Sequence, residues 1–294
     1  ELGCIYALVA LALFLSYSIL NIADLSTDSC FTLGCAVCCQ VTLLGHPILA
    51  LFAAMLAGVL SGYITAFLQT RLGVESILAG IIVNTGLYTV NLAVMGFSST
   101  LSIFKCDNIF SMAKDALGGI LGGWYKLVVA LVIVLAAAGL LALFLKTRLG
   151  LSIRATGDSP DMIKASSVNP AFTITVGLCI SGSLTALSGA VLAQYQKSCD
   201  INLGTGMVTI ALASLIIGET LIGKGGMFRR ALGAIIGSCL YRLFVAVALR
   251  LNVPAECMKL VSALIVAVAI ASPALKRYAA FQKQKATRRG GAKC

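Results

Sequence analysis

The chain has 294 residues, of which 59% are hydrophobic and only 11% are charged, and its formal net charge is +11. Soluble domains have about 25% charged residues, so this chain lacks the polar surface of a soluble globular domain. Apolar stretches of roughly 17–25 residues, the length that crosses a bilayer, recur along nearly the whole sequence. They lack the two-residue alternation of barrel strands. We therefore expect an all-α, polytopic transmembrane helix bundle.

About eight to nine spans are expected in chain order. They cover residues 4–20, 32–44, 48–70, 76–95, 124–145, 171–193, 207–222, 227–249 and 258–275. The first is interpreted as a retained span rather than a signal peptide, because no cleavage-like small-residue motif follows it. The second is too short to cross alone, and we expect it to join residues 21–31 in one broken or re-entrant span. That segment contains polar side chains that cannot face lipid: Asp24, Ser26, Thr27, Asp28 and Ser29.

The distribution of lysine and arginine predicts which side of the membrane is cytoplasmic. Alternating spans place fifteen of the 22 basic residues on one side and six on the other, with Arg242 inside a span. The richer side includes the loop 146–170 and the tail 276–294. Residues 1–275 are therefore the expected transmembrane domain of a cell-membrane protein, and 276–294 a basic cytoplasmic tail. The net charge is a topology signal rather than a sign of nucleic-acid binding, and the tail is suited to contact anionic membrane lipid.

The eleven cysteines are interpreted mainly as small apolar packing residues, because most lie within apolar stretches. The C-x-x-C formed by Cys35 and Cys38 has no second ligand pair, so packing is favoured over metal binding or redox chemistry. Three cysteines fall in predicted outer loops, where one pair could be bridged: Cys106, Cys199 and Cys257.

Small residues recur at four-residue spacing at Gly58 and Gly62, and again at Gly233 and Gly237. This spacing lets helix backbones approach closely in lipid. We expect helix packing inside one subunit, with a dimer seam as the alternative.

Two short segments resemble each other. Residues 24–34 (DLSTDSCFTLG) and 200–206 (DINLGTG) both begin with aspartate and lead into a glycine-containing helix start. The alternating topology places them on opposite faces of the membrane. An inverted repeat with broken helices near a central pathway is one hypothesis for this pattern.

Two polar features within the spans are candidates for a solute pathway. Asn84, Tyr88 and Asn91 follow helical spacing, so they either bond to neighbouring helices or line a pathway. Glu219 lies near the end of a span, where a carboxylate is costly unless it is paired or hydrated. An ion pair with Lys224, Arg229 or Arg230 and a direct role in the pathway are its two interpretations. The candidate pathway residues are Asp24, Ser26, Asn84, Tyr88, Asn91 and Glu219.

The sequence contains no pattern of residues typical of an enzyme active site. Residues 218–225 (GETLIGKG) approach the phosphate-binding loop pattern, but Gly225 stands where a Ser or Thr should hold Mg²⁺, and the preceding segment is an apolar span. The chain has one histidine and no carboxylate pair with metal-ligand spacing on a common helix. We expect no catalytic residues, no metal site and no cofactor.

Residues 150–170 (GLSIRATGDSPDMIKASSVNP) have the composition of a helix that docks on a cytosolic partner. A turn is expected at 157–160, followed by a short amphipathic helix at 161–167. Ser159 suits the cap of this helix and Pro160 its first turn.

This stretch resembles the cytoplasmic coupling loop of permease subunits in the branched-chain amino acid and ribose-type ABC importer family. The resemblance continues in residues 19–34 (ILNIADLSTDSCFTLG), 77–96 (ILAGIIVNTGLYTVNLAVMG) and 200–223 (DINLGTGMVTIALASLIIGETLIG). It covers about residues 1–275 and looks closest to tryptophan/tyrosine-type permeases. Cys30 departs from the pattern, which has a small residue such as glycine before Phe31.

The resemblance implies a permease that forms the pathway for a small polar solute, with an amino acid, and an aromatic one in particular, as the expected cargo. It also implies a second permease copy, cytosolic ABC ATPase subunits that hydrolyse ATP, and an extracytoplasmic substrate-binding protein. The coupling residues that it implies are Arg154, Asp158, Ser159, Pro160, Asp161, Met162, Ile163, Lys164 and Ala165. Nucleosides and sugars remain alternative cargoes. An ion-coupled secondary transporter and a membrane-embedded enzyme are the alternative functions.

Overall fold

We describe the protein from a computed structural model, which describes residues 1–104, 106–114, 124–159, 163, 168–223 and 226–251. Isolated positions at 260, 263–264, 267–268 and 271 are also described. The predicted coupling helix 161–167, apart from Ile163, and the predicted tail 276–294 lie outside these residues, as does most of the predicted span 258–275.

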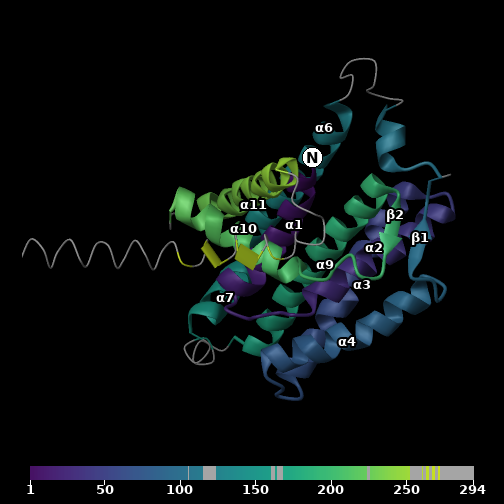
Figure 1. Cartoon of the computed structure of the whole chain (residues 1–294). Coiled ribbons are helices and arrows are strands. Elements are labelled where there is room, and N and C mark those ends of the chain that lie inside the picture. The colour runs from purple at the N-terminus through teal and green to yellow at the C-terminus, as the bar shows by residue number, and fades with distance from the viewer. Residues whose placement is uncertain are drawn as a thin grey trace, which may run out of the picture.

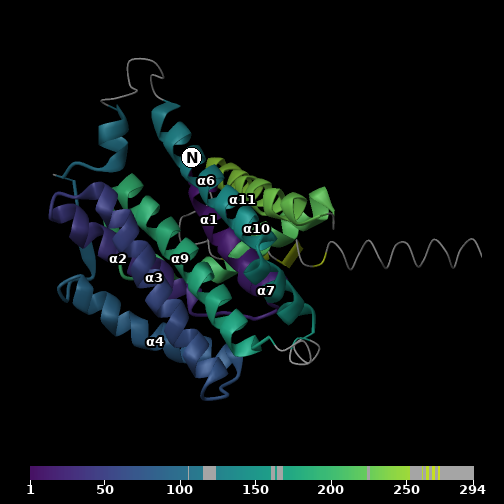
Figure 2. The ribbon, with the colours of Figure 1, turned by 180° about the vertical axis from the view of Figure 1, so that it is seen from behind.

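The polypeptide forms a helical bundle with one small sheet (Figures 1 and 2). The elements are α1 (Leu2–Leu13), the π-helix η1 (Phe14–Ile19), α2 (Thr27–Leu43), α3 (Pro47–Thr70), α4 (Ser76–Val94), β1 (Thr100–Ser102), α6 (Tyr125–Lys146), α7 (Arg148–Asp158), α9 (Pro170–Gln196), β2 (Ser198–Asp200), α10 (Met207–Ile222) and α11 (Met227–Arg250). The expected all-α polytopic bundle is confirmed.

Two helices form the centre of the bundle. In the most apolar stretches of α9 and of α1 with η1, 83% and 72% of residues are buried, against 33% or less in α3, α4, α6 and α11. Helix α9 packs mainly on α2 and α3, whereas α1 packs on α11, α9, α10 and α6. The outer helices expose leucine, isoleucine and phenylalanine, as expected for surfaces that face lipid.

Six helices of the described chain are long and apolar enough to cross a membrane, and they coincide with six of the predicted spans. Helices α2 and α10 have only 17 and 16 residues. The predicted short helix 32–44 begins earlier than expected, at Thr27. The total number of spans stays a prediction.

Glycines bring α3 and α9 into backbone contact. A Cβ on Gly58 would collide with the Gly182 carbonyl oxygen, a Cβ on Gly182 with the Gly58 carbonyl oxygen, and a Cβ on Gly62 with Leu178. Between α10 and α11, a Cβ on Gly237 would likewise collide with the Ser214 carbonyl oxygen. The expected packing inside one subunit is therefore confirmed for both glycine pairs.

The buried thiols of α2 pack against α9. Cys35 donates a hydrogen bond to the Gly189 carbonyl oxygen at 2.9 Å, and Cys38 donates to the Ala190 carbonyl oxygen at 3.5 Å. The packing interpretation of this C-x-x-C is thus confirmed. Among the predicted outer cysteines, Cys106 and Cys199 are free thiols, so no bridge joins them, and Cys257 lies outside the described residues.

A short antiparallel sheet covers the end of the bundle opposite α7. Strand β1 pairs with β2, and Leu101 lies opposite Cys199. Nearby, the Gln194 side-chain oxygen accepts a hydrogen bond from the Ile109 backbone at 3.1 Å. The described part of the segment 96–123 is therefore attached to the end of α9.

The reciprocal contact at Gly182 leads to a stability prediction. Gly182→Val should lower the thermal midpoint of the purified permease by several degrees, because overpacking a tight contact costs about 1–3 kcal/mol. Gly139→Ala in α6 is the matched control, since a Cβ there meets nothing within 4 Å. Thermal unfolding in detergent measures both, and equal midpoints for the two variants would contradict the close α3–α9 contact.

Candidate functional site

The polypeptide breaks its helical path between η1 and α2. In the π-helix η1 each hydrogen bond spans five residues instead of the four of an α-helix. At its end the Leu20 amide donates to the Leu15 carbonyl oxygen at 3.1 Å. Asn21 then adopts a left-handed conformation with φ of 59°, and regular helix resumes at Thr27. Non-helical backbone inside a membrane protein is tolerated only where protein or water covers it, so neighbouring groups must satisfy this break.

Asp24 provides several hydrogen-bond partners for the groups in this break. Its side chain is 4% exposed, and one carboxylate oxygen accepts hydrogen bonds from the Ser26 amide at 2.9 Å and the Ser26 hydroxyl at 2.7 Å. The Thr27 hydroxyl donates to the Asp24 carbonyl oxygen, and the Thr65 hydroxyl of α3 donates to the Ser26 hydroxyl at 3.3 Å. Asp24 and Ser26, both predicted pathway residues, thus lie together in the break.

Helix α4 holds the start of α2 through Ser29. The Asn84 side-chain oxygen accepts from the Ser29 amide at 3.0 Å, and the Ser29 hydroxyl donates to the Asn84 carbonyl oxygen at 2.8 Å. Asn91 donates to the Ser29 carbonyl oxygen at 3.0 Å, while its own side-chain oxygen is buried without a partner among the described residues. The two asparagines therefore bond to a neighbouring helix, which was one of the two interpretations of this stripe.

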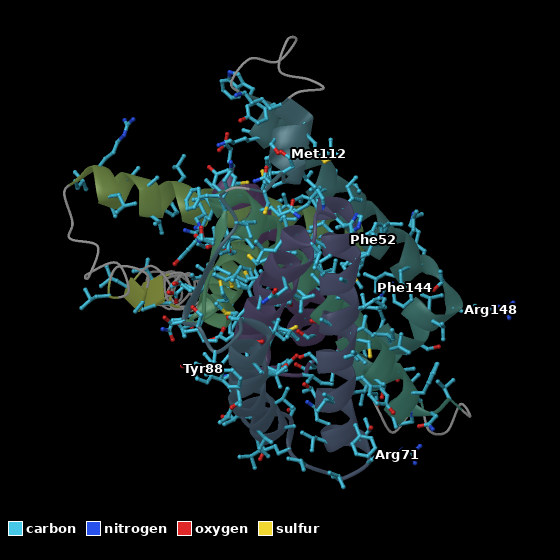
Figure 3. The ribbon with its side chains drawn as sticks, turned by 90° about the vertical axis from the view of Figure 1, so that its right-hand side faces the viewer. Phe52, Arg71, Tyr88, Met112, Phe144 and Arg148 are labelled. Atoms are coloured by element: carbon cyan, nitrogen blue, oxygen red, sulfur yellow. The ribbon has the colours of Figure 1, made fainter. Side chains whose placement is uncertain are left out.

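Tyr88 does not join them. Its side chain is 47% exposed and lies on the outer side of the bundle in Figure 3. The predicted stripe is therefore divided between a contact with α2, at Asn84 and Asn91, and an exposed surface, at Tyr88. A role for these residues in a solute pathway stays a prediction.

Asp28 joins the start of α2 to the start of α10. Its two carboxylate oxygens accept hydrogen bonds from the Gly206 amide at 3.0 Å and the Val208 amide at 2.9 Å. A negative charge is favourable there, because the first amides of a helix have no partners of their own and the helix dipole is positive at this end. The Gly204 amide also donates to the Thr32 hydroxyl at 3.2 Å.

The two resembling segments therefore meet. Gly204 and Gly206 hydrogen-bond directly to Thr32 and Asp28 of α2, and the expectation that the two segments belong to opposite faces of the membrane stays a prediction. After β2 the chain runs back into the bundle before α10 begins. The hypothesis of an inverted repeat stays a prediction.

Glu219 forms an ion pair with Arg230. The guanidinium nitrogen lies 2.8 Å from the carboxylate oxygen, and the two side chains are about one quarter exposed, at 21% and 26%. The Ser18 hydroxyl of η1 donates to the same oxygen at 3.2 Å, and Arg230 also donates to Ser18. Arg230 lies over the Phe14 ring, 5.6 Å from its centroid. Of the three predicted partners of Glu219, the structure pairs it with Arg230. Lys224 lies outside the described residues.

The coupling segment begins with a helix that the sequence was not expected to form. Helix α7 continues through Asp158, so the predicted turn at 157–160 is wrong for Gly157 and Asp158. Thr147 caps this helix by accepting from the Gly150 amide at 3.3 Å, and the chain turns extended at Ser159. The helical hydrogen bonds of 148–158 override the local turn preference of the Gly-Asp pair.

Of the predicted coupling residues, Arg154, Asp158, Ser159 and Ile163 are described, and Ile163 is 8% exposed. The Ile163 amide donates to the Ser159 carbonyl oxygen at 3.3 Å. Pro160, Asp161, Met162, Lys164 and Ala165 lie outside the described residues.

Helix α7 packs directly on the helix break. A Cβ on Gly157 would collide with the Ile19 carbonyl oxygen of η1, so only glycine permits this approach. The Thr156 and Thr173 hydroxyls, 2.8 Å apart, join α7 to α9. Since η1 also holds Ser18, the Glu219–Arg230 pair and α7 contact the same short π-helix.

Comparison with known proteins fits this architecture. The profile of the family described as branched-chain amino acid transport system / permease component matches residues 2–270. The chain belongs to this family. Its members are permease subunits of ABC transporters, so the resemblance seen in the sequence is confirmed.

Three relatives illustrate the family. A tyrosine transport system permease protein of Clostridioides difficile (strain R20291) is 32% identical over 269 residues, covering 91% of this chain and 88% of that protein. The uncharacterized protein RP368 of Rickettsia prowazekii (strain Madrid E) is 29% identical over 276 residues, covering 89% and 91%. The D-allose transport system permease protein AlsC of Escherichia coli (strain K12) is 30% identical over 223 residues, covering 72% and 64%. No solved structure matches the permease significantly.

Two residues whose present roles the sequence analysis did not predict are Ser18 and Asp28. Asp28 had a signal, since it precedes a helix start within the segment that resembles 200–206. Ser18 had none, because a lone hydroxyl in an apolar span usually bonds to its own helix. In the described part of the permease, no three His, Cys, Asp or Glu side chains gather as a metal ion would require.

Removing the Asp28 carboxylate should destabilise the permease. Asp28→Ala loses both bonds to α10, and loss of such a cap costs about 1–2 kcal/mol. Asp28→Asn keeps one side-chain oxygen and should fall between wild type and Asp28→Ala. Thermal midpoints of the purified proteins measure the series, and a wild-type midpoint for Asp28→Ala would contradict this role.

The Glu219–Arg230 pair should contribute to folding. Glu219→Gln leaves Arg230 without its counter-charge, which we expect to cost about 1–3 kcal/mol. Glu75→Gln, at an exposed carboxylate before α4, is the matched control and should have no effect. If Arg230→Gln in the same chain adds no further loss, the two side chains act as a pair. Selective loss of transport by a Glu219→Gln protein of normal stability would instead favour a role in the pathway.

Proposed function

We propose that this permease forms the translocation pathway of a binding-protein-dependent importer for an amino acid. The observation that carries the proposal is the contact of α7 with η1 at Gly157 and Ile19. It connects the segment that resembles a coupling loop to the helix break, and a permease driven by a separate ATPase needs such a connection. Membership of an ABC permease family supports the same assignment.

The proposed mechanism transmits a displacement of α7 through η1. Ser18 of η1 contacts the Glu219–Arg230 pair, so the displacement reaches α10 and α11. On its other side η1 leads through Asn21 and Asp24 into α2, whose Asp28 holds the start of α10. ATP binding to the partner subunits shifts the pathway between outward-open and inward-open states, and only by its differential affinity for the two.

The partners follow from this role. We propose cytosolic ABC ATPase subunits at α7 and residues 161–167, an extracytoplasmic substrate-binding protein at the sheet end, and a second permease copy. The excess of basic residues assigns the α7 end and the tail 276–294 to the cytoplasm. A secondary transporter is less well supported, because Glu219 is paired and one carboxylate oxygen of Asp24 already accepts two hydrogen bonds from Ser26.

The cargo proposal rests on the relatives. The relative that is 32% identical over 91% of this chain is named a tyrosine transport permease, which favours an amino acid, and an aromatic one in particular. Relatives named for D-allose and fructose transport make a sugar the second candidate. Thermal-shift screening of the partner binding protein with amino acids and sugars distinguishes the two classes.

Replacing residues 161–167 with a Gly/Ser linker of equal length should abolish co-purification of the ATPase subunits, because the docking helix is removed. The same linker at 276–282 is the matched control, since it changes a second segment of predicted cytoplasmic location. Pull-down of the tagged permease measures ATPase stoichiometry. A stoichiometric complex with the 161–167 linker would contradict the coupling assignment.

A further inference from the structure

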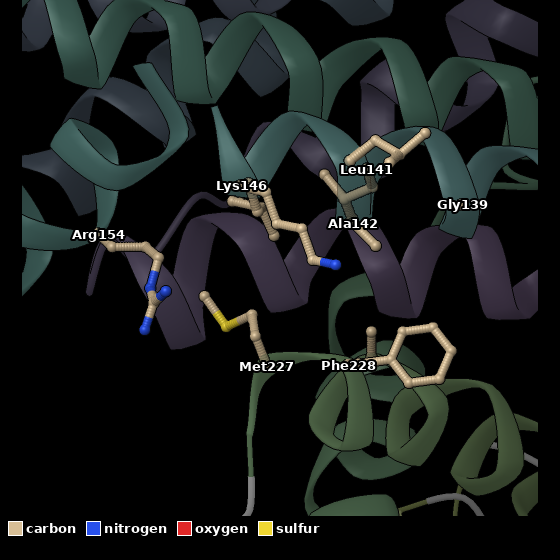
Figure 4. A pocket seen from close by; sticks show the side chains of 10 residues that line it. Gly139, Leu141, Ala142, Lys146, Arg154, Met227 and Phe228 are labelled. Atoms are coloured by element: carbon tan, nitrogen blue, oxygen red, sulfur yellow. The ribbon is translucent and has the colours of Figure 1, made fainter. Parts of the chain in front are cut away.

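A cavity of about 310 Å³ lies between the end of α6, helix α7 and the start of α11. Lys146 is the last residue of α6 and Met227 is the first residue of α11, so the cavity lies at one membrane end of both helices. In Figure 4 the Lys146 side chain reaches into the space above Met227 and Phe228, and Arg154 of α7 lies at its side. The pathway elements η1, α2 and α4 contribute no residue to its lining.

The wall combines hydrocarbon with two positive charges. Leu141, Leu145 and Phe228 supply much of the apolar lining, and Lys146 and Arg154 supply the charges. Phe228 is 63% exposed, so the apolar wall is open to the surroundings of the bundle. In the described ranges, neither cation has a carboxylate within ion-pair distance. Two cations that have no counter-charge among the described residues, beside an apolar wall, are complementary to an amphiphilic anion.

The residues that line the cavity restrict the class of ligand that fits it. Among the described residues no acidic side chain lines the cavity, so none of them would neutralise the ammonium group of an amino acid. Free phosphate would leave the leucines and Phe228 without a partner. A phospholipid fits both the charged and the apolar part of the lining, since its phosphate matches the two cations and its acyl chain matches the apolar residues. Basic pockets between membrane helices, at the level where headgroups lie, bind anionic lipids in this way.

We propose that this cavity binds an anionic phospholipid. The headgroup phosphate lies between Lys146 and Arg154, and one acyl chain follows Leu141 and Phe228 along α6 and α11. Because Arg154 belongs to α7, the lipid joins α7 to α6 and α11. This site contains no residue of the helix break or of segment 161–167, and it shares Arg154 with α7, the other part of the proposed ATPase-docking surface.

Lipid retention in native mass spectrometry tests the site. The full-length permease is reconstituted with phosphatidylcholine and phosphatidylglycerol, extracted in mild detergent, and the bound lipid is identified by mass. Lys146→Gln combined with Arg154→Gln should reduce retained phosphatidylglycerol about 10- to 30-fold, because each cation near anionic lipid contributes about 1 kcal/mol. Arg148→Gln combined with Arg229→Gln is the matched control, since both side chains are exposed near the cavity but do not line it.

A second variant tests the apolar half without changing charge. Gly139→Leu adds a side chain at a lining position where a Cβ meets nothing within 4 Å, and it replaces a helix-interior glycine, so folding should be preserved. It should also lower retention of phosphatidylglycerol.

Three results would overturn the proposal. They are unchanged retention in the Lys146/Arg154 variant, equal loss in the control pair, and equal retention of phosphatidylcholine and phosphatidylglycerol by wild type. Closure of the cavity by a second permease copy would appear as an absence of bound lipid in the wild-type dimer. The readout is lipid mass, so failure of the proposed transport function would leave it unaffected.

Discussion

The fold depends on how the backbone is satisfied where the first helix breaks. Within a membrane every amide and carbonyl must find a partner, and a chain that leaves helical geometry after Ile19 exposes several at once. Asp24 supplies hydrogen-bond partners for the break itself, while Asp28 and Ser29, within six residues of sequence, bond to α10 and α4. The positions of two short helices are thereby fixed relative to the central α9, and the remaining helices surround this frame.

Features that follow from hydrophobicity and residue spacing could be predicted from the sequence. The long spans, the packing of Gly58 and Gly62 inside one subunit and the burial of Cys35 and Cys38 all follow from residue type alone. Asn84, Tyr88 and Asn91 were recognised as one stripe, but which of them contact a neighbouring helix depends on what packs against α4, and residue spacing does not contain that information. The end of helix α7 was not predicted because Gly157 and Asp158 locally favour a turn. The contact that stabilises a helix there is made with Ile19, which is far away in the sequence.

The largest difference concerns segments far apart in the chain. A topology drawn by alternating spans treats each polar segment as belonging to one face, and it cannot show that the chain after β2 turns back into the bundle. The bond from Asp28 to Gly206 joins positions 178 residues apart, and no local pattern contains that information. Physical reasoning from sequence therefore identified both segments as unusual and failed to bring them together.

The π-helix η1 has a geometric consequence of its own. A wider hydrogen-bond ladder accommodates one more residue than an α-helix of the same length, so the residues after η1 are offset in angle from those before it by roughly 100°. Ser18 lies within this wider segment and contacts both Glu219 and Arg230. Removal of a single residue between Phe14 and Ser18 would restore an ordinary helix and rotate Ser18 away from both. The extra residue thus sets the angle between the core of the bundle and the Glu219–Arg230 pair.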